Sequence, residues 1–277
     1  MATVNPVKLG SVQKTLLLPL WGRAVESKKP RPLLVDPTAV RIVESIDYDF
    51  STIAGNISFV SQLAWIARSL HIDRTIREFL KRYPAATIVN LGCGLDTTFE
   101  RVDNGSLRWY DLDLPDVTEL RKQYIQEGPR REFIACSILD DSWMGAVQIT
   151  EGVLFIAAGV LYYFTESEIQ TIMHGLADRF PGGELVGDVC SPFGLKTANK
   201  RVIRDGGMDS SATLKWALNK AAQIHEWEPR ITILDEYPLF RGLKSGLSLK
   251  EKWGTFLSDS LRVMLIVHLA VAARSSN

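Results

Sequence analysis

The stretch Ile88-Val-Asn-Leu-Gly92-Cys-Gly94-Leu-Asp96-Thr-Thr98 decides the fold. A short apolar strand runs directly into Gly-x-Gly, and a helix start follows the second glycine. Glycines at such a junction permit a tight turn and let a ligand approach the backbone beside the unpaired N–H groups of the helix. Thr97 replaces the third glycine of the dinucleotide fingerprint, so we expect a loop around an adenosyl group rather than a pyrophosphate cradle. By itself, Gly-x-Gly fits a plain structural turn equally well.

A carboxylate follows at the end of the next expected strand, in Trp109-Tyr-Asp111-Leu-Asp113-Leu-Pro115. Asp113 lies 19 residues after Gly94. A nucleotide-binding α/β fold places the carboxylate that accepts hydrogen bonds from a ribose diol at about this distance. Two alternatives stay open: Asp113 caps the helix that begins near Pro115, or Asp111 is the binding carboxylate, since strand alternation turns both to the same face.

Short apolar runs alternate with helical segments through residues 86–277, the expected core domain. The clearest helix begins at Thr165, where Thr165 and Glu168 match a capping box, and stops at Pro181-Gly182-Gly183. Near-continuous apolar strands are typical of a parallel sheet that is covered on both faces. The sequence therefore predicts an α/β, Rossmann-like, doubly wound fold with a seven-stranded, mostly parallel sheet. The expected strands are Thr87–Leu91, Leu107–Leu112, Glu132–Cys136, Gly152–Ala158, Glu184–Cys190, Arg230–Leu234 and Arg262–Ala272.

Two additions to this core are expected. Residues 1–85 are predicted to form an N-terminal helical cap, with one apolar helical face over Val60–Ala67 and another over Ile72–Leu80. Residues 192–227 interrupt the strand pattern and are expected to form a lid insertion above the carboxyl ends of the strands, with a helix over Leu214–Ala221.

Composition narrows the class of partner. The 277 residues carry 32 Lys+Arg and 32 Asp+Glu, so the formal net charge is zero and a nucleic-acid partner is not expected. No apolar stretch reaches the roughly 20 residues of a bilayer span, and the start does not resemble an export signal. Cys93, Cys136 and Cys190 match neither a disulfide framework nor a metal site. We expect a cytoplasmic protein with a small-molecule partner, no metal and no membrane partner.

Three separated motifs resemble a known family. They are Asn90-Leu-Gly-Cys-Gly-Leu-Asp-Thr97, Tyr110-Asp-Leu-Asp-Leu-Pro115 and Leu154-Phe-Ile-Ala-Ala-Gly-Val-Leu-Tyr-Tyr-Phe164. Together they resemble the leucine carboxyl methyltransferase family, most closely its bacterial branch of polyketide O-methyltransferases of the tetracenomycin type. The N-terminal Gln13–Ser27 and Asp36-Pro37 also resemble that branch. The resemblance implies a methyltransferase whose cofactor is S-adenosylmethionine.

The resemblance also implies where the cofactor binds. Arg68 matches the arginine that pairs with the methionine carboxylate of the cofactor, and helical spacing places it at the edge of an apolar face. Gly92 and Gly94 match the loop beside the cofactor, and Asp113 matches the carboxylate that binds its ribose.

Further positions follow from the same resemblance. Ser137 and Ile138 match the pair that faces the adenine, with Asp140 as a partner for its amino group. Arg23 matches an N-terminal basic residue of the site. One cofactor position departs from the family: relatives carry a glutamate after the fourth strand, where this chain has Ala158. Alanine cannot replace the hydrogen bonds of a carboxylate.

Methyl transfer from a sulfonium is an in-line displacement that depends on alignment and dry surroundings more than on acid or base help. A carboxylate acceptor is already ionised at neutral pH, and the sequence shows no Ser/His/Asp arrangement. We therefore expect O-methylation of a carboxylate on a small natural-product or polyketide-like acid. A phenolic acceptor would need a base, for which His225 is the first candidate, and binding of the cofactor without turnover is a third reading. The aromatic side chains expected at the acceptor are Tyr163, Phe164, Trp216 and Trp227.

Overall fold

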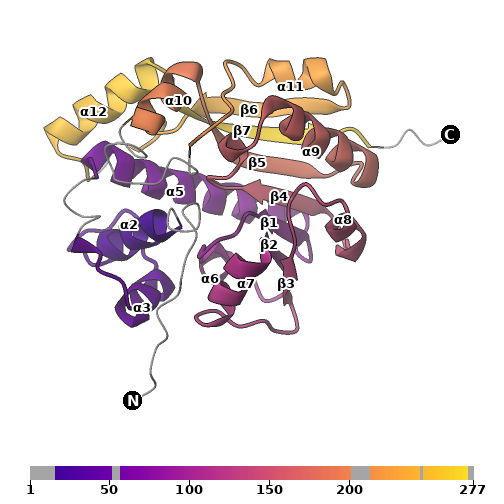
Figure 1. The fold of residues 1–277 in the computed structure, drawn as a ribbon, viewed down its shortest axis with the longest axis horizontal. Helices are drawn as coiled ribbons and strands as arrows, with labels where there is room; N and C mark the ends of the chain where they lie inside the picture. The colour runs from indigo at the N-terminus through magenta and orange to yellow at the C-terminus, as the bar shows by residue number, and fades with distance from the viewer. Residues whose placement is uncertain (1–15, 52–56, 201–212, 244–245, 274–277) are drawn as a thin grey trace.

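The structure is a computed structural model that describes residues 16–51, 57–200, 213–243 and 246–273. At its centre is a seven-stranded sheet in the order β3-β2-β1-β4-β5-β7-β6 (Figure 1). Strands β1 to β5 run parallel, whereas β7 is antiparallel to both β5 and β6. The predicted fold class is confirmed. The strands are β1 Thr87–Leu91, β2 Arg108–Asp113, β3 Arg131–Ala135, β4 Val153–Ala157, β5 Glu184–Cys190, β6 Ile231–Pro238 and β7 Met264–Val271.

The parallel strands begin and end within one residue of the expected runs. Every residue of β1, β4 and β5 is buried, which accounts for their near-continuous apolar sequence. Strand β1 pairs with β2 on one side and with β4 on the other. The chain order therefore reverses direction across the sheet at β1, and open α/β sheets bind ligands outside the carboxyl ends of the strands at such a point.

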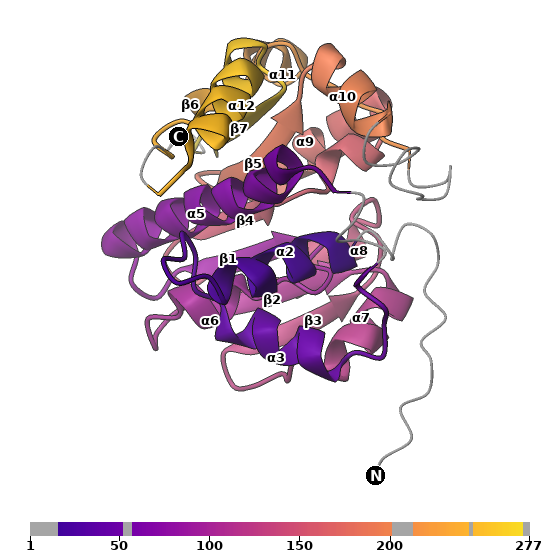
Figure 2. The same ribbon diagram turned by 90° about the vertical axis from the view of Figure 1, so that its left-hand side faces the viewer.

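Helices cover both faces of the sheet, as Figure 2 shows from the side. One face packs against α8, α9 and α11, and the other against α5 and α6. The two apolar faces predicted for the N-terminal region belong to one continuous helix, α5. The helices are α2 Leu17–Ser27, α3 Pro37–Ser45, α5 Phe59–Arg82, α6 Thr98–Val102, α7 Pro115–Lys122, α8 Ser142–Ala146, α9 Glu166–Arg179, α10 Pro192–Ala198, α11 Ala222–Trp227 and α12 Leu249–Ser260, with a 3-10 turn η1 at Leu161–Tyr163.

The helix predicted after Thr165 is present as α9, but the helix predicted in the insertion after β5 is not. The capping box of Thr165 and Glu168 is present at α9 as predicted. The helix predicted over Leu214–Ala221 is wrong: its described backbone is irregular, and a helix begins only at Ala222. The N–H groups of Lys215 and Trp216 donate to the carbonyl of Tyr162 instead of to helical partners. Residues 201–212 of the expected lid lie outside the described residues.

Within the described residues, no helix is both long enough and apolar enough to cross a bilayer.

Candidate functional site

A cavity of about 1040 Å³ opens at the carboxyl ends of β1, β2, β4 and β5. Ligand pockets usually measure roughly 300–1,000 Å³, so this cavity is among the larger ones. Strand ends and the glycine loop form one half, and the N-terminal half of α5 with α10 and α12 forms the other. The cavity thus lies where the strand order reverses.

The glycine loop has a shape that only glycine permits. Gly92 and Gly94 have φ angles of +64° and +49°, in the left-handed region. A Cβ atom on Gly92 would lie 2.5 Å from Cγ2 of Val160, and one on Gly94 would lie 2.8 Å from Cδ2 of Leu16. Both glycines line the cavity. The absence of side chains therefore lets Val160 and Leu16 pack directly against the loop, whose backbone borders the cavity.

The structure separates the two carboxylates of β2 that spacing leaves equivalent. Asp113, at the end of the strand, lines the cavity and accepts a hydrogen bond of 2.7 Å from the Gly94 N–H. Burial raises the pKa of Asp113, while hydrogen bonds from the Gly94 and Leu114 N–H groups oppose that rise. Asp111 is fully buried and does not line the cavity. Of the two, only Asp113 is available to a ligand.

Asp111 instead anchors two guanidinium groups beneath the glycine loop. Its Oδ2 lies 2.9 Å from Nη2 of Arg121 and 2.7 Å from Nε of Arg131. Arg121 also donates from Nη1 to the Gly94 carbonyl at 2.7 Å. This arrangement ties the end of β2, the helix α7 and the glycine loop into one unit.

Arg23 supports the same loop from the N-terminal side. Its Nη2 donates to the Leu95 carbonyl at 3.1 Å, and its Nε pairs with Asp36 at 3.0 Å. Arg23 lines the cavity, as expected from the sequence, but its guanidinium is engaged by protein groups. Its polar contacts position the loop.

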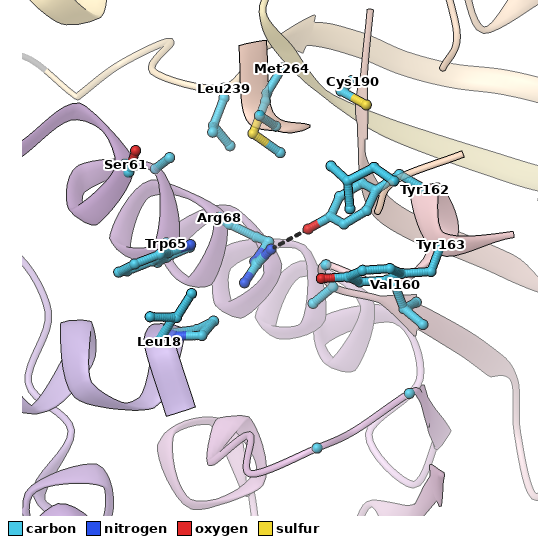
Figure 3. Close-up of a pocket in the computed structure, with 18 of the residues that line it drawn as sticks. Leu18, Ser61, Trp65, Arg68, Val160, Tyr162, Tyr163, Cys190, Leu239 and Met264 are labelled. Atoms are coloured by element: carbon cyan, nitrogen blue, oxygen red, sulfur yellow. Dashed lines mark hydrogen bonds between the residues drawn. The ribbon is translucent and has the colours of Figure 1, made fainter. Parts of the chain in front are cut away.

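Arg68 provides a positive charge across the cavity from the loop. Its Nη1 lies 3.2 Å from Oδ2 of Asp188 and 3.3 Å from the hydroxyl of Tyr162. Figure 3 shows Arg68 directed toward Tyr162, with Trp65 nearby. Burial alone would lower the pKa of Arg68, but the facing Asp188 and Tyr162 raise it above its usual value. The guanidinium therefore stays charged.

Asp188 is a residue that the sequence analysis missed. It lies on β5, is fully buried, and accepts a 2.6 Å hydrogen bond from the Gly159 N–H. It therefore places a carboxylate beside the turn in which Ala158 stands instead of a glutamate. Because Asp188 does not line the cavity, it acts on Arg68 and Gly159 and not on a ligand. Its signal in the sequence is an acid in the middle of β5, where the neighbouring residues are apolar or glycine.

The remaining predicted residues divide into two groups. Ala158 lines the cavity, together with Ser137 and Ile138 from the end of β3 and Tyr163 and Phe164 from the turn after β4. Three others lie outside the lining: Asp140, Trp216 and Trp227.

Local packing explains the three exceptions. Asp140 is exposed and accepts a hydrogen bond from the Ser142 N–H at the start of α8. Trp216 is buried in the core beneath the sheet, and Trp227 packs against that core. From Trp216 onward, the expected lid therefore packs into the core, whereas Leu214 lines the cavity.

The half of the cavity formed by α5, α10 and α12 is mainly apolar. Leu239 and Met264 lie across it from Trp65, and Tyr163 is directed into the same space (Figure 3). Among the described residues, no histidine lines the cavity, and the only lining carboxylates are Asp96 and Asp113, at the glycine loop and the end of β2. His225 accordingly lies away from the cavity, with Nδ1 2.8 Å from the Ile231 carbonyl.

The polar side chains of this half include lysines and a tyrosine. Lys196 and Lys200, from α10 and the residues after it, line the cavity and are exposed. Burial and the neighbouring Asp188 raise the pKa of Tyr162 well above its usual value, so its phenol stays protonated. The described residues of this half thus offer positive charge and hydroxyl groups, but no carboxylate or imidazole base.

Comparison with known sequences gives consistent similarities. The sequence model of the leucine carboxyl methyltransferase family matches residues 17–177, more than half of the chain. The tetracenomycin polyketide synthesis O-methyltransferase TcmP of Streptomyces glaucescens is 29% identical over 235 residues, which cover 84% of this chain and 85% of that protein. The S-adenosyl-L-methionine-dependent methyltransferase dpfgK of Gibberella zeae is 31% identical over 200 residues, 66% of each chain.

Solved structures share the fold. A DUF574 family protein from Streptomyces avermitilis has a TM-score of 0.58 at 12% identity, over 93% of this chain and 97% of that one. A structure described as a putative methyltransferase from Thermobifida fusca has a TM-score of 0.57 at 15% identity, over 91% and 94% of the two chains. Their likeness extends over nearly the whole chain.

The cluster around Asp111 leads to a stability prediction. Asp111→Asn leaves two buried guanidinium groups without their shared counter-charge, which we expect to lower the free energy of unfolding by about 3–5 kcal/mol. The matched control is Asp178→Asn, which removes an exposed partner of Arg230 and is expected to cost at most about 1 kcal/mol. Urea unfolding of both variants measures the difference, and equal losses would contradict the role of Asp111.

Proposed function

Because the chain belongs to the leucine carboxyl methyltransferase family, we propose that it methylates the carboxylate of a small, largely apolar, polyketide-like acid. Membership of the family makes the chain an O-methyltransferase that uses S-adenosylmethionine. The polyketide part of the proposal is supported by the relative from Streptomyces glaucescens, which is named for tetracenomycin polyketide synthesis.

The residues at the glycine loop fit the proposed cofactor. Gly92 and Gly94 place loop backbone at the cavity wall, and the Asp113 carboxylate can accept hydrogen bonds from a ribose diol. Ile138 offers an apolar wall for the adenine, and Arg68 offers a cation for the methionine carboxylate. The bound cofactor would supply a methyl group activated by the positive sulfur. The tasks of the chain are then to align an acceptor oxygen with that methyl and to exclude water.

We choose a carboxylate acceptor because the described residues that line the acceptor half include no carboxylate or imidazole base. A carboxylate needs none at neutral pH, whereas a phenol with a pKa near 10 is largely protonated there. The lysines Lys196 and Lys200 add positive potential that attracts an anionic acceptor. The apolar lining around Leu239 and Met264 suits the carbon skeleton of such an acid. The phenolic alternative loses its candidate base, because His225 lies outside the cavity.

Cofactor affinity tests the assignment of Asp113. Asp113→Asn keeps the shape but loses the charge that strengthens hydrogen bonds to a ribose, and we expect S-adenosylmethionine to bind about 10- to 150-fold more weakly. The matched control is Asp140→Asn, which changes an exposed acid outside the cavity and should leave the affinity unchanged. Calorimetric titration of both variants decides the point: equal affinities would remove Asp113 from the site, and a loss in Asp140→Asn alone would restore the adenine role of Asp140.

The pH dependence of transfer tests the acceptor. Burial raises the pKa of Cys190 to about 12 and raises that of Tyr162 well above its usual value, so neither group ionises between pH 6 and 9. With a carboxylate acceptor, kcat/KM should stay level across that range. With a phenol acceptor, it should climb toward pH 9 as the phenolate forms.

A product assay complements the pH profile. The protein is incubated with methyl-labelled S-adenosylmethionine and a set of polycyclic aromatic acids, each paired with the phenol that lacks the carboxyl group. Mild alkali releases labelled methanol from a methyl ester and leaves an aryl methyl ether intact. Label that survives alkali would overturn the carboxylate assignment, and binding of the cofactor without any transfer would favour a protein that does not turn over.

A further inference from the structure

Helix α12 turns its apolar side chains outward, whereas an ordinary surface helix turns them toward the core. Its apolar side chains at Leu249, Trp253, Phe256 and Leu257, with Leu261 just beyond its end, are between 47% and 79% exposed. Their spacing of four, three, one and four residues places them along one side of the helix, at about 100° per residue. A surface helix normally turns this side toward the core. The outward apolar side therefore calls for a partner.

The inward side of α12 consists of small and polar residues. A Cβ atom on Gly254 would lie 2.9 Å from Cζ of Phe59 and 3.0 Å from Cγ2 of Val60, so the helix approaches the start of α5 closely. Thr255 is buried and bonds to the backbone of its own helix. The reversed orientation is therefore held by packing, and the apolar residues are not free to turn inward.

The exposed apolar face continues into the mouth of the cavity. Leu257 and Leu261 are exposed and also line the cavity, and the same is true of Phe193 on α10. Figures 1 and 2 show α10 and α12 side by side at one end of the molecule, above α5. An apolar molecule that reaches this face is thus already at the entrance of the acceptor half.

The charges around this face are positive. Lys250 and Lys252 flank the apolar residues of α12, and Lys196 and Lys200 lie at the cavity they adjoin. The two acids of the helix are engaged by backbone N–H groups: Glu251 accepts from the Ser248 N–H, and Asp259 accepts from the Phe240 N–H. Exposed Trp, Phe and Leu side chains bordered by lysines are typical of a helix that lies in the interface of an anionic membrane.

We propose that α12 docks this protein on an anionic lipid bilayer surface, with Trp253 and Phe256 entering the interface and the cavity mouth facing the lipid. This proposal goes beyond the assigned transfer reaction and departs from the expectation that the chain has no membrane partner. A second copy of the chain fits the face less well. In a two-fold dimer packed through this face, the lysines of the two copies would lie close together, because both acids of α12 already accept hydrogen bonds from backbone N–H groups.

Vesicle binding tests the proposal with the full chain. Sedimentation is measured with vesicles of phosphatidylcholine containing one quarter phosphatidylglycerol, and with vesicles of phosphatidylcholine alone. We expect binding to the anionic vesicles that weakens at high salt. Trp253→Ser with Phe256→Ser should weaken it at least about tenfold, and Lys250→Gln with Lys252→Gln by about 30-fold, at about fivefold per lysine. The control, Leu234→Ser, changes an exposed apolar residue on β6, away from α12, and should bind as the unaltered chain does.

Lipid docking can be distinguished from packing of a second copy of the chain on α12. Unaltered melting temperatures show that the variants fold, which exposed positions should permit. No binding to anionic vesicles, or binding that the α12 variants leave unchanged, would overturn the proposal. Light scattering that shows a dimer dissolved by Trp253→Ser with Phe256→Ser, without vesicle binding, would assign the face to a second copy. Vesicle sedimentation needs neither cofactor nor acceptor, so its outcome is independent of the proposed function.

Discussion

The guanidinium of Arg121 connects the sheet to the glycine loop, and the rest of the site depends on that connection. It pairs with Asp111 inside the sheet and donates to the carbonyl of Gly94 in the loop. A buried N–H group without an acceptor is costly, and movement of the loop would take the Gly94 carbonyl away from Nη1 of Arg121. From that fixed position, the Gly94 N–H holds the carboxylate of Asp113 at the edge of the cavity.

The two halves of the cavity are built from different parts of the fold. Strand ends and the glycine loop line the proposed cofactor half, where the Asp113 carboxylate faces the cation of Arg68, on α5, across the cavity. Helices α5, α10 and α12 form the proposed acceptor half, which is mainly apolar with lysines in its lining. This division matches the chemistry of the proposed reaction. A charged cofactor needs precise polar contacts, whereas a carboxylate acceptor that is already ionised needs only alignment and exclusion of water.

Sequence patterns predicted the parallel sheet closely, and their failures share a cause. The helix predicted over Leu214–Ala221 is irregular because its N–H groups bond to Tyr162 and Cys190, which periodicity cannot anticipate. Trp216 is a core residue because the same segment returns beneath the sheet. Helix α12 was not predicted at all, since its apolar residues face outward and a search for a buried apolar stripe does not find it. In each case the deciding contacts join segments that are distant in the chain.

The sequence by itself determined the succession of strands along the chain, the glycine loop, the capped helix after Thr165 and the family. All of these depend on residues close together in the chain, where spacing alone carries the physics. Only the tertiary structure decided which acid serves which purpose. It buried Asp111 among guanidinium groups, left Asp113 at the cavity, and brought Asp188 to Arg68 across 120 residues of chain. Neighbouring acids on one strand have the same local signal, and they differ only in the charges that the folded chain brings to them.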